Sequence, residues 1–392
     1  MKQAITNNAA VNRQPTRRQA RLILEDGSEF QGFSFGKARS LAGEVVFTTT
    51  MSGFPQTLTD PGYRGQILVA AYPLVTGCNI PVAAKTGETI FDSQGLPVEL
   101  ESNGIQISGF IAAELLDDPG CSLSAWLEKN NVPGICGIDT RVLVKRLREH
   151  GVMRGKILVE GTRDVTLDSG SSANPVEEVS VQEVKKYLPA EQDKKTNEKK
   201  PKENKTIKIA FIDCGAKANI IRCLLNRNVE ITVFPWNHEP GIKEFDGFVL
   251  SGGPGDPKAC GKTIAAIRRA FDSKKPVFGI GLGCNIMALA AGADTYKLPW
   301  GHRGGNQPCI ETTTSRCYVT SQNHGYAIRS ESLPKSWEPW FINGNDNSIE
   351  GIRSLRDPFS AVQFQPEGSP GSRDTEFLFD KFLAQIKEMK NA

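Results

Sequence analysis

Long apolar runs and histidine are scarce in this sequence. No stretch approaches the roughly 18 apolar residues needed to span a bilayer, so we expect no membrane segment. Only four histidines occur in 392 residues, and the nine cysteines include no C-x-x-C pair and none at zinc-ligand spacing from a histidine. We therefore predict no metal site, and free thiols in a reducing compartment.

A strong charge of either sign is also lacking. Lys and Arg number 47 against 44 Asp and Glu, which leaves a net charge of +3 and does not indicate a nucleic-acid partner. The hydrophobic content of 39% and charged content of 23% are globular values, and they exclude a wholly disordered or fibrous chain. A chain of this length is too long to fold around a single hydrophobic core, so we expect two domains.

The first 20 residues are polar, and they contain arginines but no acidic residue. We predict a disordered tail over residues 1–20 and a cytoplasmic protein. A mitochondrial presequence is the alternative, because such segments are also poor in acids. Pro15 interrupts any helix there, and no apolar stripe is visible.

Residues 21–184 have the pattern of a β-rich domain with few helices. Residues 44–50 are β-branched and residues 67–72 are apolar, as is typical of strands. Residues 122–130 and 139–149 have helical spacing, and Gly151 follows the second of them as an end signal.

A lysine-rich stretch, residues 185–206, separates this domain from the next. Its lysines alternate with acids and it has almost no apolar residues, so it predicts a solvated linker. A nucleic-acid contact is the alternative interpretation.

Residues 207–388 alternate between apolar strands and helices, which predicts an α/β domain with a mostly parallel sheet flanked by helices. Ligands bind such sheets at the carboxyl ends of the strands. We expect strands at 207–213, 230–234, 247–250 and 276–280, and helices at 261–273 and 284–291.

Two glycine-rich loops, residues 251–257 and 279–285, follow predicted strands of this domain. Neither ends in Gly-Lys-Ser/Thr and neither completes G-x-G-x-x-G, so a nucleotide site is poorly supported. The second loop has the order strand, tight glycine turn, helix, which is the layout of a nucleophile elbow. Its central residue is Gly281, which has no side chain to attack with.

Several short motifs occur in one order along the chain: LEDG (24–27), AGEVVF (42–47), ESNGI (101–105), GIDTR (137–141), GPGDP (253–257) and SQNHGY (321–326). Through these motifs the chain, from Arg21 to about Lys387, resembles the small, glutaminase-type subunit of carbamoyl phosphate synthetase. The resemblance implies a β-rich N-terminal domain peculiar to that subunit, followed by a class I glutamine amidotransferase domain.

In this family a cysteine at the elbow attacks glutamine, a histidine serves as base and a glutamate orients the histidine. The sequence departs from that pattern at two of the three positions. Gly281 stands at the nucleophile position and Gln365 at the base position, whereas the acid, Glu367, remains. An amide takes up no proton near neutral pH, so the departure predicts a chain that cannot hydrolyse glutamine.

The resemblance also assigns a glutamine pocket, in which the backbone N–H groups of Gly253 and Leu282 match the oxyanion donors. We expect glutamine as a weak ligand at most. The pocket positions are Thr50, Gly253, Gly255, Leu282, Asn285, Asn323, Gly325 and Tyr326.

Cys284, one helical turn beyond the elbow, is a candidate replacement thiol. A helix N-terminus lowers a thiol pKa, and the resemblance places His324 nearby. We nevertheless expect a small half-buried cysteine without chemistry, and the replacement thiol is the alternative.

The resemblance implies a partner, an ATP-grasp large subunit that uses free ammonia. It implies no cofactor in this chain. It leaves open whether pyrimidine or arginine synthesis is served. Two alternatives remain: a pseudo-glutaminase that acts as a binding or regulatory module, and an active glutaminase that uses Cys284.

Overall fold

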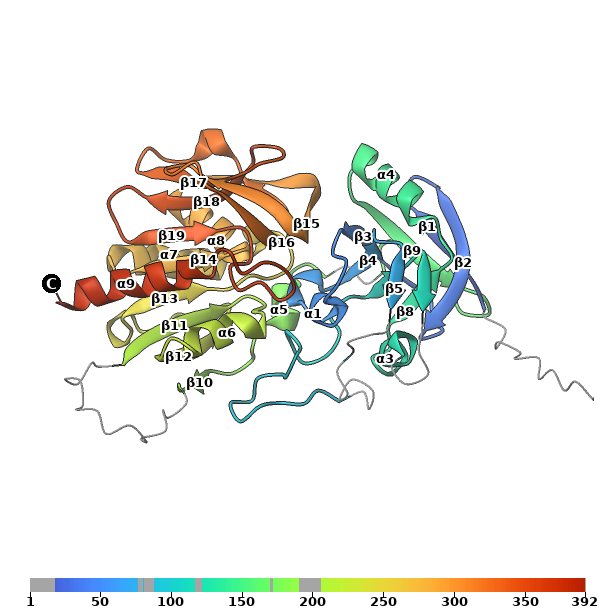
Figure 1. Cartoon of the computed structure of the whole chain (residues 1–392), viewed down its shortest axis with the longest axis horizontal. Coiled ribbons are helices and arrows are strands. Elements are labelled where there is room, and N and C mark those ends of the chain that lie inside the picture. The colour runs from blue at the N-terminus through green and yellow to red at the C-terminus, as the bar shows by residue number, and fades with distance from the viewer. Residues whose placement is uncertain are drawn as a thin grey trace, which may run out of the picture.

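Two domains lie side by side along the long axis of the computed structural model (Figure 1). The structure describes residues 18–76, 80, 88–116, 122–169, 172–189 and 206–391. Most of the predicted N-terminal tail lies outside these residues. The first strand begins at Gln19, slightly before the predicted start of the first domain.

A closed β-barrel forms the N-terminal domain, in the strand order β1-β2-β8-β6-β4-β3-β9. A short parallel pair, β5 and β7, lies beside it. The strands are β1 (Gln19–Leu24), β2 (Glu29–Gly36), β3 (Leu41–Thr48), β4 (Gln66–Ala70), β5 (Leu74–Thr76), β6 (Gly109–Ile111), β7 (Glu114–Leu116), β8 (Pro133–Cys136) and β9 (Met153–Val159).

Alternation of buried and half-exposed residues along β9 fills the barrel from one face of the strand. Gly155 of β9 pairs with Gly43 of β3, and a Cβ at Gly155 would lie 2.6 Å from Val45. Glycine is needed here because the two strands approach closely. The helical segments are α1 (Phe54–Leu58), η1 (Pro61–Tyr63), α3 (Leu123–Lys129) and α4 (Thr140–His150).

The predicted N-cap of α4 is present: the Asp139 side chain accepts hydrogen bonds from the backbone N–H groups of Arg141 and Val142. Gly151 ends the helix with a positive φ of 90°, as the sequence predicts.

A ten-stranded mixed sheet forms the second domain, in the order β10-β12-β11-β13-β14-β19-β18-β16-β15-β17. Five neighbouring strands, β12, β11, β13, β14 and β19, run parallel to one another, and the other strands join the sheet antiparallel. The strands are β10 (Lys185–Tyr187), β11 (Ile207–Asp213), β12 (Val229–Pro235), β13 (Gly247–Leu250), β14 (Val277–Ile280), β15 (Thr295–Glu311), β16 (Cys317–Ile328), β17 (Trp337–Asn343), β18 (Ile349–Ser354) and β19 (Phe359–Val362).

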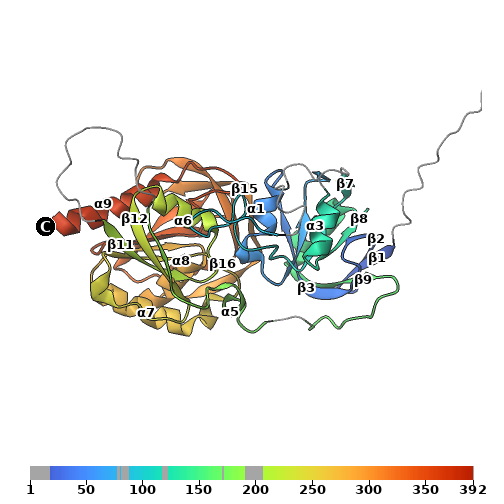
Figure 2. The ribbon, with the colours of Figure 1, turned by 90° about the horizontal axis from the view of Figure 1, so that it is seen from below.

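Helices cover both faces of this sheet, which confirms the predicted α/β class (Figure 2). One apolar core lies under α6 and α9, and a second lies under α7 and α8. None of the described helices is both long and apolar enough to cross a membrane. The helical segments are α5 (Val176–Val179), α6 (Ala218–Leu225), η2 (Ile242–Glu244), η3 (Pro257–Ala259), α7 (Gly261–Asp272), α8 (Leu282–Ala291), η4 (Ser330–Ser332) and α9 (Phe377–Asn391).

The predicted linker 185–206 is wrong at its start. Lys185–Tyr187 forms β10, the edge strand that pairs antiparallel with β12. Tyr187 is buried in the core under α6, while the two lysines face outward, as charged residues on an edge strand do. Val176 also packs into the second domain, so the chain reaches this domain before residue 184. Residues 190–205 of the predicted linker lie outside the described residues.

Polar contacts join the two domains through buried side chains. Asp60 of the first domain accepts hydrogen bonds from Asn323 (2.9 Å) and Gln365 (3.1 Å) of the second. Glu101, 1% exposed, accepts from the Asn219 backbone N–H (3.0 Å) and from Ser369 Oγ (2.5 Å). Hydrogen bonds of this kind are costly to break, because each lost partner leaves a buried polar group unsatisfied.

We expect Glu101→Ala to lower the free energy of unfolding by about 3 kcal/mol. The substitution removes a buried carboxylate and leaves its hydrogen-bond donors, the Asn219 N–H and Ser369 Oγ, without an acceptor. Urea unfolding measures this change. Glu25→Ala, at an exposed glutamate of the same domain, is the matched control. Equal unfolding midpoints for the two variants would contradict a stabilising role for the interface.

Candidate functional site

The predicted elbow is present between β14 and α8. Gly281 lies between the strand and the helix with φ 57° and ψ −116°, a backbone conformation that residues with a side chain rarely adopt. Its N–H donates to the Val362 carbonyl at 2.8 Å. The apex therefore has the strained turn of a nucleophile elbow.

The glycines on either side of the apex are needed for packing. A Cβ at Gly279 would lie 2.6 Å from Met287 Sδ, and a Cβ at Gly283 would lie 2.7 Å from the Leu250 carbonyl oxygen. At Gly281 itself the nearest atom to an added Cβ is Gly252 Cα, at 3.3 Å. The apex thus has more room for a side chain than its two neighbours.

Gln365, at the predicted base position, is held by three side chains. Its Oε1 accepts from Lys217 Nζ at 3.1 Å and from Ser321 Oγ at 3.3 Å, and its Nε2 donates to Asp60 Oδ2 at 3.1 Å. Both ends of the amide are therefore engaged, one of them across the domain interface.

Glu367, at the predicted acid position, is fully buried and pairs with Lys217. The two charged groups are 3.2 Å apart, and Lys217 is itself only 3% exposed. Lys217 Nζ also donates to the Gly368 carbonyl at 2.5 Å. The carboxylate that would orient a catalytic histidine is thus paired with an ammonium group, a partner that the sequence analysis did not predict.

Burial shifts the pKa values of this pair. Desolvation raises the pKa of Glu367 to about 7, although the Lys217 ammonium opposes the shift. Burial alone would lower the pKa of Lys217, but Glu367, Glu101 and Asp60 raise it overall. The lysine therefore stays charged, since three carboxyl groups surround it.

A cavity of about 610 Å³ lies between the domains, and most of the residues predicted to bind glutamine line it. Its walls include all the predicted glutamine-binding residues except Thr50: Gly253, Gly255, Leu282, Asn285, Asn323, Gly325 and Tyr326. Thr50 is buried outside this wall, where its Oγ1 accepts from Thr48 Oγ1 at 2.9 Å. The three predicted catalytic positions, Gly281, Gln365 and Glu367, are likewise not part of the wall.

Two amide side chains in the cavity wall have unsatisfied polar atoms. Asn285 is 2% exposed and Gln363 is 1% exposed, and both contribute to the wall. Asn285 Oδ1 and both amide atoms of Gln363 lack a hydrogen-bond partner among the described residues. Buried polar atoms of this kind normally bond to a ligand or to water. The sequence analysis did not predict Gln363 as a pocket residue. Its only sequence signal is its position in the Gln-Phe-Gln-Pro-Glu segment, two residues before Gln365.

Gly253, a predicted oxyanion donor, is fixed by close approach of the backbone. A Cβ there would overlap the carbonyl oxygen of Cys214 and would lie 3.2 Å from Leu282 Cδ2. Only glycine fits at this point, whatever the ligand.

The structure contradicts the alternative in which Cys284 replaces the missing nucleophile. The residue is fully buried in the core under α7 and α8, and desolvation raises the pKa of its thiol well above the usual value. Burial outweighs the helix N-terminus here, because an apolar surrounding disfavours the thiolate. Nor is His324 free to serve as its base, since both ring nitrogens contact other groups.

Family comparisons match both domains. Residues 22–157 match the model "Carbamoyl-phosphate synthase small chain, CPSase domain", and residues 210–385 match "Glutamine amidotransferase class-I". The chain combines a carbamoyl-phosphate synthase small-chain domain with a class-I glutamine amidotransferase domain. The resemblance found in the sequence is thereby confirmed.

Similar proteins share this region over nearly the whole chain. Multifunctional protein pyr1-3 of Dictyostelium discoideum is 43% identical over 94% of this chain, and multifunctional protein URA2 of Saccharomyces cerevisiae is 42% identical over 94%. The human "Carbamoyl-phosphate synthase [ammonia], mitochondrial" is 42% identical over 95%. The chain spans 17%, 18% and 24% of the length of these relatives, respectively.

The elbow geometry predicts a ranking of glycine substitutions in this amidotransferase domain. We expect Gly279→Ala to destabilise more than Gly281→Ala, which should cost roughly 1–3 kcal/mol through backbone strain. Gly261→Ala is the control, because a Cβ there meets nothing within 4 Å and alanine favours the helix. Urea unfolding of the three variants gives the ranking, and a Gly279→Ala variant as stable as the control would refute it.

The buried Glu367 predicts a pH dependence of stability. Its folded pKa of about 7 lies above the ordinary value of 4.5, so the folded state binds the proton more tightly. This contribution to stability is complete below pH 4.5 and is lost as the pH rises through 7.

We therefore expect the wild type to lose roughly 1–3 kcal/mol relative to Glu367→Gln between pH 5 and pH 8. Thermal unfolding across this range tests the expectation, with Glu388→Gln on an exposed part of α9 as the control. Parallel profiles for wild type and Glu367→Gln would contradict it.

Proposed function

We propose that this chain is a carbamoyl-phosphate synthase small-chain homologue that does not hydrolyse glutamine. In this proposal it supports an ATP-using synthetase supplied with free ammonia, carried on a separate chain or elsewhere on the same polypeptide. The small-chain and amidotransferase domains provide the framework for this proposal. The finer points rest on the elbow and its surroundings.

The observation that carries the proposal is the apex of the elbow. Gly281 has the strained backbone that presents a nucleophile, at φ 57°, and it carries no side chain. Covalent hydrolysis of an amide by this family's route requires a thiolate at that point. The turn is retained while the reacting atom is absent.

The surroundings of the base position support the same conclusion. Gln365 supplies an amide, which takes up no proton near neutral pH, and both of its ends are bonded. The Lys217 ammonium lies 3.2 Å from Glu367 Oε1, so the carboxylate is already paired with a cation. A thiol at the apex alone would therefore find no base.

Use of ammonia is suggested by one relative. The printed name of the human protein specifies ammonia, and its 378 aligned residues are 42% identical to this chain. We extend that chemistry to this chain because a small-chain domain without glutaminase activity delivers no ammonia of its own.

A second candidate function is an amide-binding regulatory module. The unpartnered atoms of Asn285 and Gln363 in the wall of the cavity favour it, since they match the donors and acceptors of a side-chain amide. Isothermal titration with glutamine distinguishes the two candidates. Binding without turnover supports the amide-binding module, whereas the absence of binding rules the module out and keeps the first proposal.

We expect the purified chain to release no glutamate from glutamine above the buffer rate. Gly281→Cys and Gln365→His should each remain inactive, because one lacks a base and the other lacks a nucleophile. The double variant should give measurable hydrolysis, since the effects of such residues are strongly non-additive. Cys284 is left unchanged because it belongs to the core.

Glutamate release measured with and without Cys284→Ser serves as the control. Activity in the unmodified chain that disappears with Cys284→Ser would overturn the proposal. A folded double variant that neither hydrolyses glutamine nor reacts with a glutamine-like electrophile would show that the pocket has lost its fit to the substrate.

A further inference from the structure

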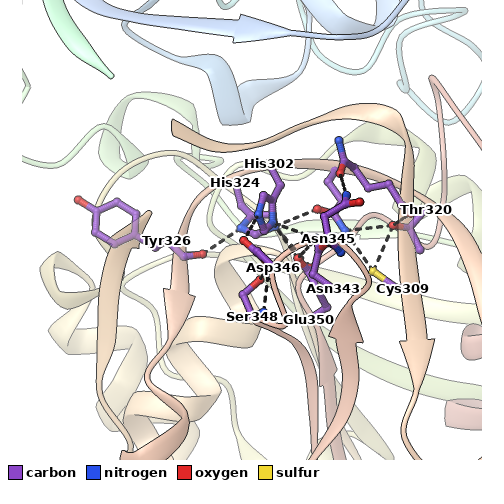
Figure 3. A network of polar contacts seen from close by, with 12 residues as sticks. His302, Cys309, Thr320, His324, Tyr326, Asn343, Asn345, Asp346, Ser348 and Glu350 are labelled. Carbon is purple, nitrogen blue, oxygen red and sulfur yellow. Dashed lines mark hydrogen bonds and ion pairs between the residues drawn. The ribbon is translucent and has the colours of Figure 1, made fainter. Parts of the chain in front are cut away.

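A cluster of two histidines and a glutamate lies inside the amidotransferase domain, apart from the elbow. His302 comes from β15, His324 from β16 and Glu350 from β18, and Figure 3 shows the three side chains turned toward one another. His302 and His324 are each 8% exposed and Glu350 is 0% exposed. One ligand atom from each lies within 4.8 Å of the others.

The ring nitrogens of both histidines divide into an inner and an outer set. The inner nitrogens face Glu350: His302 Nδ1 is 2.8 Å from Oε1, and His324 Nε2 is 3.5 Å from Oε2. The outer nitrogens are held by other groups, His302 Nε2 by Asp346 Oδ2 at 2.9 Å and His324 Nδ1 by the Tyr326 carbonyl at 2.9 Å. Metal-bound histidines have this arrangement, with the second nitrogen donating to a carboxylate or a backbone carbonyl.

A fourth oxygen faces the same point. Gln322 Oε1 lies 3.3 Å from His324 Nε2, and Gln322 is 2% exposed. Its Nε2 donates to Thr320 Oγ1 at 3.1 Å and to Cys309 Sγ at 3.2 Å. These bonds engage the amide nitrogen and leave the amide oxygen facing His324.

Glu350 itself supplies an independent indication. Its Oε2 is buried and accepts no hydrogen bond from any of the described residues. The other oxygen, Oε1, accepts from Asn343 Nδ2 at 3.0 Å, which fixes the orientation of the carboxylate. An unsatisfied carboxylate oxygen in a dry interior is costly unless a cation completes its coordination.

We propose that His302 Nδ1, His324 Nε2, Glu350 and Gln322 Oε1 bind one divalent transition-metal ion of the zinc class. Ligands at about 2.0–2.1 Å on a tetrahedron lie about 3.3 Å apart. The separations of 2.8 Å to Glu350 Oε1, 3.5 Å to Glu350 Oε2 and 3.3 Å to Gln322 Oε1 lie near that value, and the ligand atoms of the two histidines and Glu350 are all within 4.8 Å of one another. Two imidazole ligands select zinc, cobalt or nickel over magnesium and calcium.

The sequence analysis predicts no metal site, and this proposal departs from it. Residues 302, 324 and 350 are too widely spaced for any short metal motif. The pairing of β15 with β16 places His302 opposite His324 and makes them neighbours. The adjacent β18 brings Glu350 beneath them.

The ion would tie together the strands that reach the other domain. Arg303, next to His302, accepts on its carbonyl from the Thr49 N–H at 3.2 Å, and Asn323, next to His324, donates to Asp60 at 2.9 Å. With four protein ligands the site is closed, as structural zinc sites are. Its role is to hold the domain interface, and it does not depend on whether the chain hydrolyses glutamine.

Cobalt titration of the full-length chain tests the proposal. We expect one Co²⁺ per chain with the intense visible bands of tetrahedral coordination, displaced by one equivalent of Zn²⁺, and a higher melting temperature with either ion. Glu350→Gln should abolish the bands. Asp346→Asn should weaken affinity about 10–100-fold while keeping them, because Asp346 only orients His302.

The other two histidines of the chain provide the controls, and His150→Ala and His238→Ala should bind cobalt as the wild type does. All variants carry Cys317→Ser, to remove an exposed thiol that would bind metal by itself.

X-ray absorption at the zinc edge needs no site variant. We expect a nitrogen and oxygen shell at about 2.0 Å with imidazole outer-shell scattering and no sulfur at about 2.3 Å. Failure to retain an ion after desalting, a sulfur shell, or bands that survive Glu350→Gln would each overturn the proposal and leave a cluster bridged by protons alone.

Discussion

The buried ammonium of Lys217 is the interaction on which the site and the domain interface both depend. It lies 3.2 Å from Glu367 and 3.1 Å from Gln365, and it donates to the Gly368 carbonyl. Burying such a charge is tolerable only where anions and carbonyls surround it, and Glu101 from the other domain adds to that field. The arrangement therefore links Glu367, Gln365 and the N-terminal domain to one buried ammonium group.

The elbow shows which of its glycines are required by packing and which by backbone conformation. Gly279 and Gly283 are dictated by packing, since a Cβ at either would overlap neighbouring atoms. The strain at Gly281 follows from the junction of strand and helix and does not require a reacting side chain. Glycine at the apex even relieves that strain, because it adopts positive φ freely. Packing thus requires glycine at positions 279 and 283, whereas at position 281 the constraint is the backbone conformation.

The long hairpin of β15 and β16 contributes to the domain interface, to the cavity and to the histidine cluster. It brings Asn323 to Asp60 at the interface, Gly325 and Tyr326 to the cavity, and the two histidines to Glu350. Because one face of a strand points outward and the other inward, successive residues serve different sites. The histidine cluster and the interface contacts are consequently formed by neighbouring residues of the same two strands.

The sequence by itself determined the α/β class, the strands at 207–213 and 247–250, the α4 cap and the elbow with its glycine apex. These features are local, since periodicity, capping residues and glycine turns act over a few neighbouring positions. The tertiary structure decided the rest. It made Lys185–Tyr187 an edge strand, buried Cys284 in the core, and paired Lys217 with Glu367 from 150 residues away. Such outcomes depend on which surfaces meet in the folded chain, because burial and charge pairing are properties of contacts between distant segments.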